Sequence, residues 1–173
     1  MTDAATTTPS DEPIITMVRV FDAPRELVFQ AWTDPAHLAQ WWGPHGFTNP
    51  VCEVDLRPGG AWRIDMQGPD GTIYPNKGIY QEVVVPERLV FSDIVDDDTD
   101  AWGNSPPPPS SVSTITFEEH DGKTKITMTT RLQSIAARDA MVEMGAVAGW
   151  TESMERLDIL LRDRNLSSPL HSR

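Results

Sequence analysis

The hydrophobic and polar residues of the chain alternate with two periods, one typical of strands and one typical of a helix. Between Trp62 and Met66 the apolar residues are separated by Arg63 and Asp65, which is the period of two expected for a half-buried strand. Other apolar and β-branched runs, bounded by turn residues, predict further strands. These runs cover residues 14–21, 52–56, 78–85 and 89–94. Much of the chain is therefore predicted to form antiparallel β-structure.

A β-hairpin around Asp121-Gly122 is the most detailed local prediction. An Asp-Gly pair between two alternating segments is typical of a two-residue hairpin turn. This turn fixes which residues of the two strands lie opposite each other. The predicted pairs are His120 with Lys123, Glu118 with Lys125, Phe117 with Ile126, Thr116 with Thr127, Ile115 with Met128, Thr114 with Thr129, and Ser113 with Thr130. One face of the hairpin is then apolar at its middle, and the other carries an ion pair and threonines.

A helical period takes over near the C-terminus and predicts one long amphipathic helix. Apolar residues recur there at spacings of three and four. They are Ala140, Met144, Val147, Trp150, Met154, Leu157 and Leu161. Gly145 and Gly149 interrupt this helix at a cost of about 1 kcal/mol each relative to alanine, which indicates close packing or a bend. Two short helices are expected earlier, within residues 24–33 and 35–42, and Trp41-Trp42 should form a packed corner at the end of the second.

The chain is acidic, with 26 Asp and Glu against 14 Lys and Arg and a formal net charge of −12. Binding to nucleic acid is disfavoured, because it requires basic side chains that neutralise phosphates. No apolar run approaches the ~20 residues of a membrane-spanning helix, and the first residues do not resemble a signal peptide. The single cysteine, Cys52, cannot form an internal disulfide, which fits a reducing compartment. We therefore expect a cytoplasmic protein without a membrane span or a nucleic-acid partner.

The 173 residues suffice for one domain. We predict a disordered N-terminal tail over residues 1–13, a single domain over residues 14–163 and a C-terminal tail over residues 164–173. Residues 96–110 contain a run of aspartates and four consecutive prolines, without Lys or Arg. Because proline cannot pair within a sheet, this segment is predicted to be a loop that projects from the sheet.

Short motifs follow one another in an order typical of a known family. They are Val20–Pro24, Val28–Trp32, Trp41–Pro44, Leu56–Gly60, Pro86–Phe91 and Gly149-Trp150. With the order of the elements, they resemble the START-like (SRPBCC) superfamily over residues 14–163, and more narrowly the bacterial homologues of the heat-shock protein 90 ATPase activator. The resemblance implies an α+β helix-grip fold: a curved antiparallel sheet of six or seven strands, two short helices and one long C-terminal helix over the sheet. It also implies a cavity between that helix and the sheet.

The cavity would be lined by inward-facing strand residues and by the long helix. The candidate ligand-binding residues are Trp62, Ile64, Met66, Tyr80, Ser113, Ile115, Met128, Thr130, Met144 and Ala148. An apolar wall with a few hydroxyls suits an apolar or amphipathic small molecule. The alternative is that these side chains meet and fill the space as core.

Residues typical of catalysis are sparse. None of the four histidines has a Cys, Asp or Glu at metal-ligand spacing, so we expect neither a metal nor a cofactor. Cys52 lies among apolar strand residues and is predicted to be a buried hydrophobic residue rather than a nucleophile. Arg63 and Asp65 are expected to form a surface ion pair. Tyr80 is the best candidate for an acid or hydrogen-bond donor in the cavity, against a packed tyrosine.

Three functions follow from this resemblance, and we favour the first. The protein binds an unidentified apolar or amphipathic small molecule without catalysis. Alternatively, it is a co-chaperone-like interaction module whose acidic loop contacts a basic partner, or a cyclase or dehydratase that uses Tyr80, Ser113 or Thr130. An ionisable group buried in the cavity would favour the enzyme, and an exposed apolar patch beside the loop would favour the interaction module. A homodimer or a chaperone partner stays open.

Overall fold

A computed structural model describes residues 4–7, 11–93 and 111–167 of the chain. In these ranges the elements are β1 (Ala4–Thr7), β2 (Ile14–Phe21), α1 (Arg25–Thr33), α2 (Pro35–Trp41), β3 (Thr48–Val54), β4 (Ala61–Gln67), β5 (Ile73–Val84), β6 (Arg88–Asp93), β7 (Ser111–His120), β8 (Lys123–Leu132), α3 (Ile135–Glu143) and α4 (Ala146–Ser167). The described strands form one eight-stranded sheet in the order β1-β2-β8-β7-β6-β5-β4-β3. All neighbouring strands are antiparallel.

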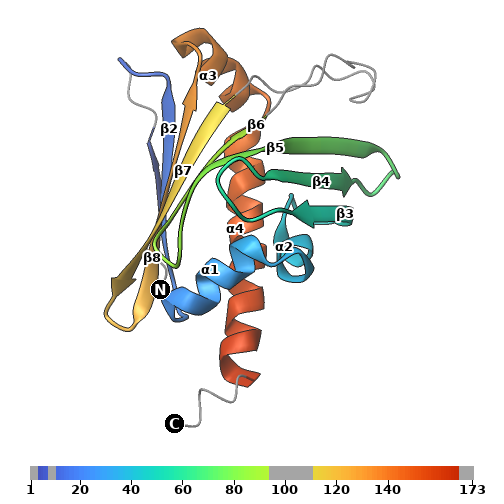
Figure 1. Ribbon diagram of the computed structural model, residues 1–173. Coiled ribbons are helices and arrows are strands. Elements are labelled where there is room, and N and C mark those ends of the chain that lie inside the picture. The colour runs from blue at the N-terminus through green and yellow to red at the C-terminus, as the bar shows by residue number, and fades with distance from the viewer. Residues whose placement is uncertain (1–3, 8–10, 94–110, 168–173) are drawn as a thin grey trace.

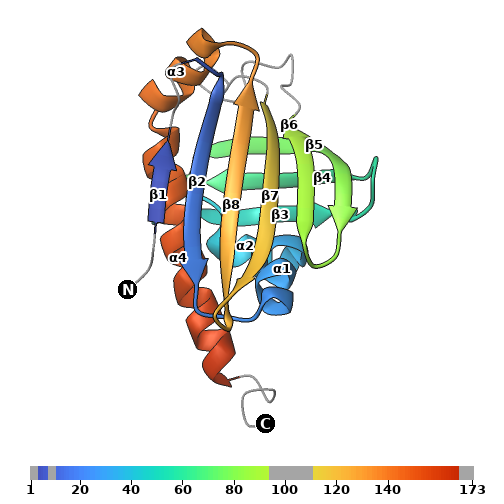
Figure 2. The ribbon, with the colours of Figure 1, turned by 90° about the vertical axis from the view of Figure 1, so that its left-hand side faces the viewer.

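The sheet is strongly curved, and the long helix α4 lies along its concave side (Figure 1). In the view turned by 90° about the vertical axis, β2, β8 and β7 run almost at right angles to β3 and β4, which lie behind them (Figure 2). The short helices α1 and α2 cover one end of the concavity. This arrangement is the α+β helix-grip fold that the sequence predicted, which is confirmed. No helix in the described ranges combines the length and the apolar character needed to cross a membrane.

The β7–β8 hairpin has the predicted register. Every predicted pair, from His120 with Lys123 to Ser113 with Thr130, lies opposite in the ladder. The turn residues Asp121 and Gly122 have φ values of 52° and 78°, as a tight two-residue turn requires. The prediction succeeded because the pairing depends only on local pattern and turn chemistry.

The single long helix predicted near the C-terminus is instead two helices, α3 and α4. Gly145 between them has a φ of 88°, a left-handed conformation that ends α3 and that glycine adopts without steric cost. Ser134 accepts a hydrogen bond from the amide of Ala137 and caps the start of α3. The apolar stripe read from the sequence therefore spans a break, and Met144 lies in it with 45 % of its surface exposed.

The chain ends also differ from the predicted boundaries. Residues 4–7, predicted to belong to a disordered tail, form β1 and pair with residues 16–19 of β2. An edge strand is held by backbone hydrogen bonds, which a polar sequence can make as well as an apolar one. At the other end, α4 continues to Ser167, beyond residue 163. The predicted acidic loop over residues 96–110 lies outside the described residues.

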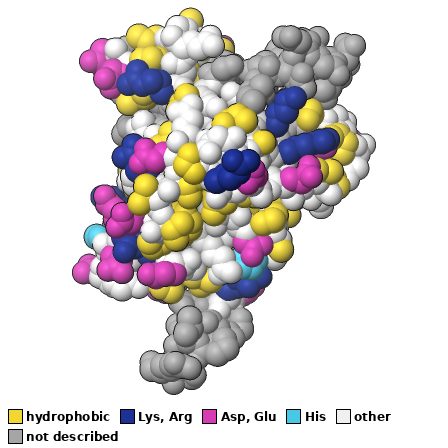
Figure 3. Space-filling view, in the orientation of Figure 1, with side chains coloured by type: hydrophobic (Ala, Val, Ile, Leu, Met, Phe, Trp, Pro, Cys, Tyr) yellow, Lys and Arg dark blue, Asp and Glu magenta, His cyan; other side chains and the backbone are white. Residues whose placement is uncertain are grey.

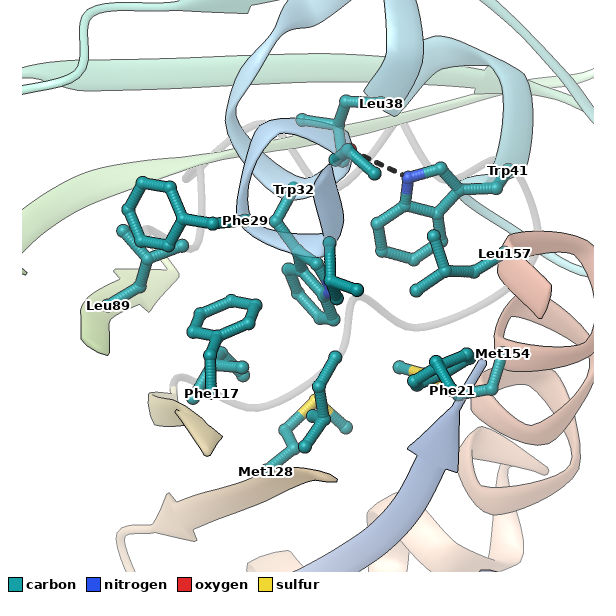
Figure 4. Packing of buried hydrophobic residues seen from close by; sticks show 14 of the residues in the cluster. Phe21, Phe29, Trp32, Leu38, Trp41, Leu89, Phe117, Met128, Met154 and Leu157 are labelled. Atoms are coloured by element: carbon teal, nitrogen blue, oxygen red, sulfur yellow. Dashed lines mark hydrogen bonds between the residues drawn. The ribbon is translucent and has the colours of Figure 1, made fainter. Parts of the chain in front are cut away.

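The core is built around aromatic residues that α1 and α2 pack onto the sheet (Figure 4). The rings of Trp32 and Trp41 meet edge to face with centroids 4.8 Å apart, and those of Phe29 and Phe117 with centroids 5.2 Å apart. The indole N–H of Trp41 donates to the backbone oxygen of Ala31 over 2.9 Å. Trp41 is thus a buried corner residue, as predicted, and its contacts fix the end of α2 against α1.

Candidate functional site

A pocket of about 360 Å³ lies between the first turns of α4 and the concave face of the sheet. Most of its lining is aromatic or methionine side chains, with polar groups gathered on β5, β6 and β7. The lining comprises Trp32, Trp41, Trp42, Gly43, Pro44, Phe47, Met66, Tyr74, Asn76, Phe91, Asp93, Ser111, Ser113, Met128, Met141, Met144, Gly145, Ala146, Gly149, Trp150, Ser153 and Met154.

Strand alternation explains which sheet residues reach the pocket. Alternate residues of a strand share a face, so Phe91 and Asp93 of β6 point the same way. Phe91 lies opposite Ser113 of β7 in the ladder. Ser111, two residues before Ser113, therefore lies on the same face near Asp93. These residues form a strip that is apolar at Phe91 and polar at the ends of the two strands.

Asp93 carries the charge of this strip. The hydroxyl of Ser111 donates to its Oδ2 atom over 2.7 Å. Burial raises the pKa of Asp93 to about 6, and the hydrogen bond from Ser111 only partly opposes that rise. Of the described lining residues, Asp93 alone has an ionisable acidic or basic side chain with a charge near neutral pH. The pocket thus combines an apolar wall with one acidic position.

The opposite wall is a loop that follows α2 and is tied to α4. The guanidinium of Arg156 donates to the backbone oxygens of Trp42, Gly43 and Pro44 over 3.1, 2.9 and 3.0 Å, and to that of Gln40 over 3.0 Å. Partial burial lowers the pKa of Arg156. The amide of Gly43 donates to the hydroxyl of Ser153 over 3.0 Å. These bonds hold the Trp42–Pro44 wall at a fixed distance from α4.

Four of the predicted ligand-binding residues line this pocket: Met66, Ser113, Met128 and Met144. Three others, Trp62, Ile64 and Tyr80, lie deeper in the core around a void of only about 20 Å³. Ile115 and Thr130 are fully buried, and Thr130 shares a 3.0 Å hydrogen bond with Ser113.

Ala148, the remaining candidate, is exposed and lies outside the lining. Within α4, Ala146, Gly149, Trp150 and Ser153 recur at spacings of three and four and face the pocket. Ala148 lies two residues from Trp150, which places it on the other side of the helix.

The polar end of the pocket contains residues that are absent from the predicted ligand-binding set. Asp93 falls within the strand predicted over residues 89–94, and its alternation with Phe91 places it on the inner face, yet it is absent from the predicted ligand-binding residues. Tyr74 and Asn76 lie outside the strand predicted over residues 78–85, because β5 already begins at Ile73. Ser111 lies beyond Ser113 with Thr130, the last pair predicted for the hairpin. Trp42 was expected in a packed corner, and its ring is instead half-buried at the pocket.

The other candidates for chemistry lie away from the pocket. Burial raises the pKa of Cys52 to about 11, so its thiol stays protonated near neutral pH and is a poor nucleophile. Burial also raises the pKa of Tyr80. Arg63 and Asp65 form the expected ion pair at 2.8 Å, although Asp65 is only 7 % exposed. No three His, Cys, Asp or Glu side chains of the described ranges come together in a way that could hold a metal ion.

The fold and its pocket define a member of the START-like superfamily, and the comparisons give the family within it. Residues 22–162 match the family described as "Activator of Hsp90 ATPase homolog 1-like protein". The chain belongs to this family, as its motifs predicted. A comparison with curated proteins found no match.

Solved structures of bacterial proteins share the fold over nearly the whole chain. A crystal structure from Mycobacterium smegmatis is 30 % identical with a TM-score of 0.79, and it matches 92 % of this chain and 97 % of its own. A solution structure from Arthrobacter aurescens is 26 % identical with a TM-score of 0.81 and matches 92 % and 91 %. The AHSA1 protein from Silicibacter pomeroyi is 26 % identical with a TM-score of 0.70 and matches 86 % and 97 %.

Proposed function

We propose that this protein binds a small amphipathic molecule in the pocket between α4 and the sheet. The observation that carries the proposal is the pocket itself, about 360 Å³ in volume, with an apolar wall and polar groups at one end. Ligand sites in proteins have volumes of roughly 300–1,000 Å³ and combine mostly apolar walls with a few placed polar groups. The methionines of the wall can adapt to ligands of irregular shape.

The charges on one face of the molecule do not favour docking to a strongly charged partner. On the face over α2 and α4, acidic and basic side chains are interspersed and apolar side chains lie between them (Figure 3). No described patch of a single charge on that face offers a surface for a strongly charged partner. The co-chaperone-like alternative depends on the acidic loop over residues 96–110.

A neutral fluorescent probe tests the proposal. N-phenyl-1-naphthylamine gains fluorescence in apolar sites, and we expect saturable binding to the wild-type protein. Gly149→Phe should weaken that binding at least severalfold, because residue 149 lines the pocket and a Cβ there would meet only Pro44, at 3.7 Å. Ala148→Phe is the matched control, because the neighbouring residue is exposed. Equal binding by all three proteins, or none by the wild type, would refute the proposal.

An enzyme of the cyclase or dehydratase kind is the second candidate, and Asp93 favours it. An ionisable group in the pocket was the feature expected to distinguish an enzyme from a passive binder. With a pKa of about 6, Asp93 could exchange a proton with a bound molecule near neutral pH. Mass spectrometry of compounds incubated with wild type and Asp93→Asn tests this function. Only catalysis predicts a mass change that the variant abolishes.

A further inference from the structure

Asp93 is the one ionised side chain among the described residues that line the pocket. The rest of the lining described above contains no Lys, Arg, His or Glu. A carboxylate at such a site loses water and regains only part of that stabilisation from the hydroxyl of Ser111, 2.7 Å away. An anionic ligand would add repulsion to this cost, whereas a cation would offset it.

The neighbouring side chains suit an organic cation. Ser113 lies two residues from Ser111 on β7, and Asn76 lies two residues from Gly78, the residue opposite Asp93. Asn76 donates to the backbone oxygen of Tyr74 and Ser113 shares a hydrogen bond with Thr130, and the remaining lone pairs of these neutral groups can accept hydrogen bonds from a ligand. Trp42, Tyr74 and Trp150 add aromatic rings to the same pocket, and such rings attract organic cations through their faces.

From this combination we infer that the ligand is an amphipathic amine, with its protonated nitrogen held by Asp93 and its apolar body against the aromatic and methionine wall. The inference rests on the proposed function and names its ligand class. It is specific to one end of the pocket: the nitrogen lies at the ends of β6 and β7, and the apolar part extends toward Trp150 of α4. A simple aliphatic or aromatic acid of the same size is expected to bind more weakly, because its charge has the same sign as that of Asp93.

Three probes of one shape and different charge test the inference. They are 2-(1-naphthyl)ethylamine, 2-(1-naphthyl)ethanol and 1-naphthylacetate, titrated by calorimetry at about pH 8 and roughly 0.15 M salt, where exposed charges are screened beyond about 8 Å. We expect the amine to bind wild type at least roughly tenfold more tightly than the alcohol, and the acid to bind most weakly. In Asp93→Asn the amine should lose that advantage, while the affinity for the alcohol changes less than about twofold.

A matched surface variant separates the effect of the Asp93 carboxylate from the effect of the protein's overall negative charge. Glu119→Gln removes one negative charge from an exposed residue at the far end of β7. It should leave the preference for the amine intact. If Glu119→Gln and Asp93→Asn lower the affinity for the amine equally, or if neither does, the preference does not come from Asp93 and the inference is overturned.

The wild-type protein alone also tests the inference, whatever the variants do. Equal affinity for amine and alcohol, or tighter binding of the acid, would overturn it. If N-phenyl-1-naphthylamine binds in the pocket but 2-(1-naphthyl)ethylamine does not, the inference about Asp93 is refuted and the proposed function stands. If neither that neutral probe nor any of the three binds, both fail together.

Discussion

Gly78 of β5 lies directly opposite Trp62 of β4, and the indole ring occupies the space of a side chain at residue 78. A Cβ atom on Gly78 would lie 2.7 Å from two carbon atoms of the ring and would also collide with the backbone oxygen of Ser92. Both obstacles are rigid, because Trp62 is 4 % exposed in the core and Ser92 belongs to the neighbouring strand. Glycine at position 78 therefore allows three strands to pack closely.

Gly78→Ala should destabilise the fold for this reason. Overpacking a rigid core costs about 1–3 kcal/mol, and we expect a loss in this range in the free energy of unfolding measured with urea. Gly149→Ala is the control, because its Cβ would make an ordinary contact of 3.7 Å with Pro44 within a helix. That variant should be unchanged or up to about 1 kcal/mol more stable. Equal effects of the two substitutions would contradict the packing argument.

The stability of the protein should depend on pH through Asp93. Its pKa rises from 3.8 in the unfolded chain to about 6 in the fold because of burial. Between these values the native state holds more protons than the unfolded state, so stability falls as pH rises, and the cost is complete above about pH 6. One pKa unit corresponds to about 1.4 kcal/mol, and remaining contact with solvent reduces the total to about 1–3 kcal/mol.

Asp93→Asn should remove this dependence. The variant should be about 1–3 kcal/mol more stable than wild type at pH 8 and nearly equal to it at about pH 4, because a neutral amide pays no cost of burying a charge. Urea unfolding at several pH values measures both curves. A variant that is less stable at pH 8 would show that the carboxylate stabilises the fold, for example through Ser111.

Local patterns predicted the elements better than they predicted the pocket. The β7–β8 register followed from Asp121-Gly122 and strict alternation, which involve neighbouring parts of the chain only. The motifs also identified the helix-grip fold, because turn and packing residues in a fixed order are specific for a topology. The edge strand over residues 4–7 was not predicted, because its backbone pairing with β2 requires no particular pattern of side chains.

The pocket depends on rotations that a pattern does not contain. The sequence indicates a possible bend at Gly145, but not the φ of 88° that divides the predicted helix into α3 and α4 and separates their directions. Trp62 and Tyr80 have the expected inward direction, yet other side chains of the core cover them. The sequence predicts the direction in which a strand residue points, and the packing of distant elements decides whether open space remains in front of it.

Arg156 should contribute more to stability than an ordinary charged side chain. It donates to four backbone oxygens between Gln40 and Pro44, and these bonds connect α4 to the loop after α2. Hydrogen bonds from a charged group contribute about 1.5–3 kcal/mol each but are not additive, so we expect Arg156→Met to cost about 2–4 kcal/mol.

Arg57→Met is the control for this prediction. Arg57 is 67 % exposed and pairs only locally with Asp55, so its loss should cost less than about 1 kcal/mol. Arg156→Lys should remain well below wild type, because an ammonium group cannot reproduce the planar set of donors. Full stability in Arg156→Lys would mean that charge, and not the set of hydrogen bonds, holds the loop.

Trp150 and Leu157 lie two turns apart on α4 and should differ in their energetic roles. Leu157 is fully buried in the main core, and Leu157→Ala should cost about 3–5 kcal/mol by leaving a cavity. Trp150 is half-buried and borders the open pocket, so Trp150→Ala should cost only about 1–3 kcal/mol despite the larger side chain.

Trp150→Ala should also weaken the binding of N-phenyl-1-naphthylamine. Trp150→Phe should bind this probe with the wild-type affinity, because a phenyl ring retains the apolar contact. Urea unfolding and probe titration of the variants measure both quantities. A loss of stability as large as that of Leu157→Ala, with unchanged probe binding, would mean that Trp150 is a core residue and that the ligand site lies elsewhere.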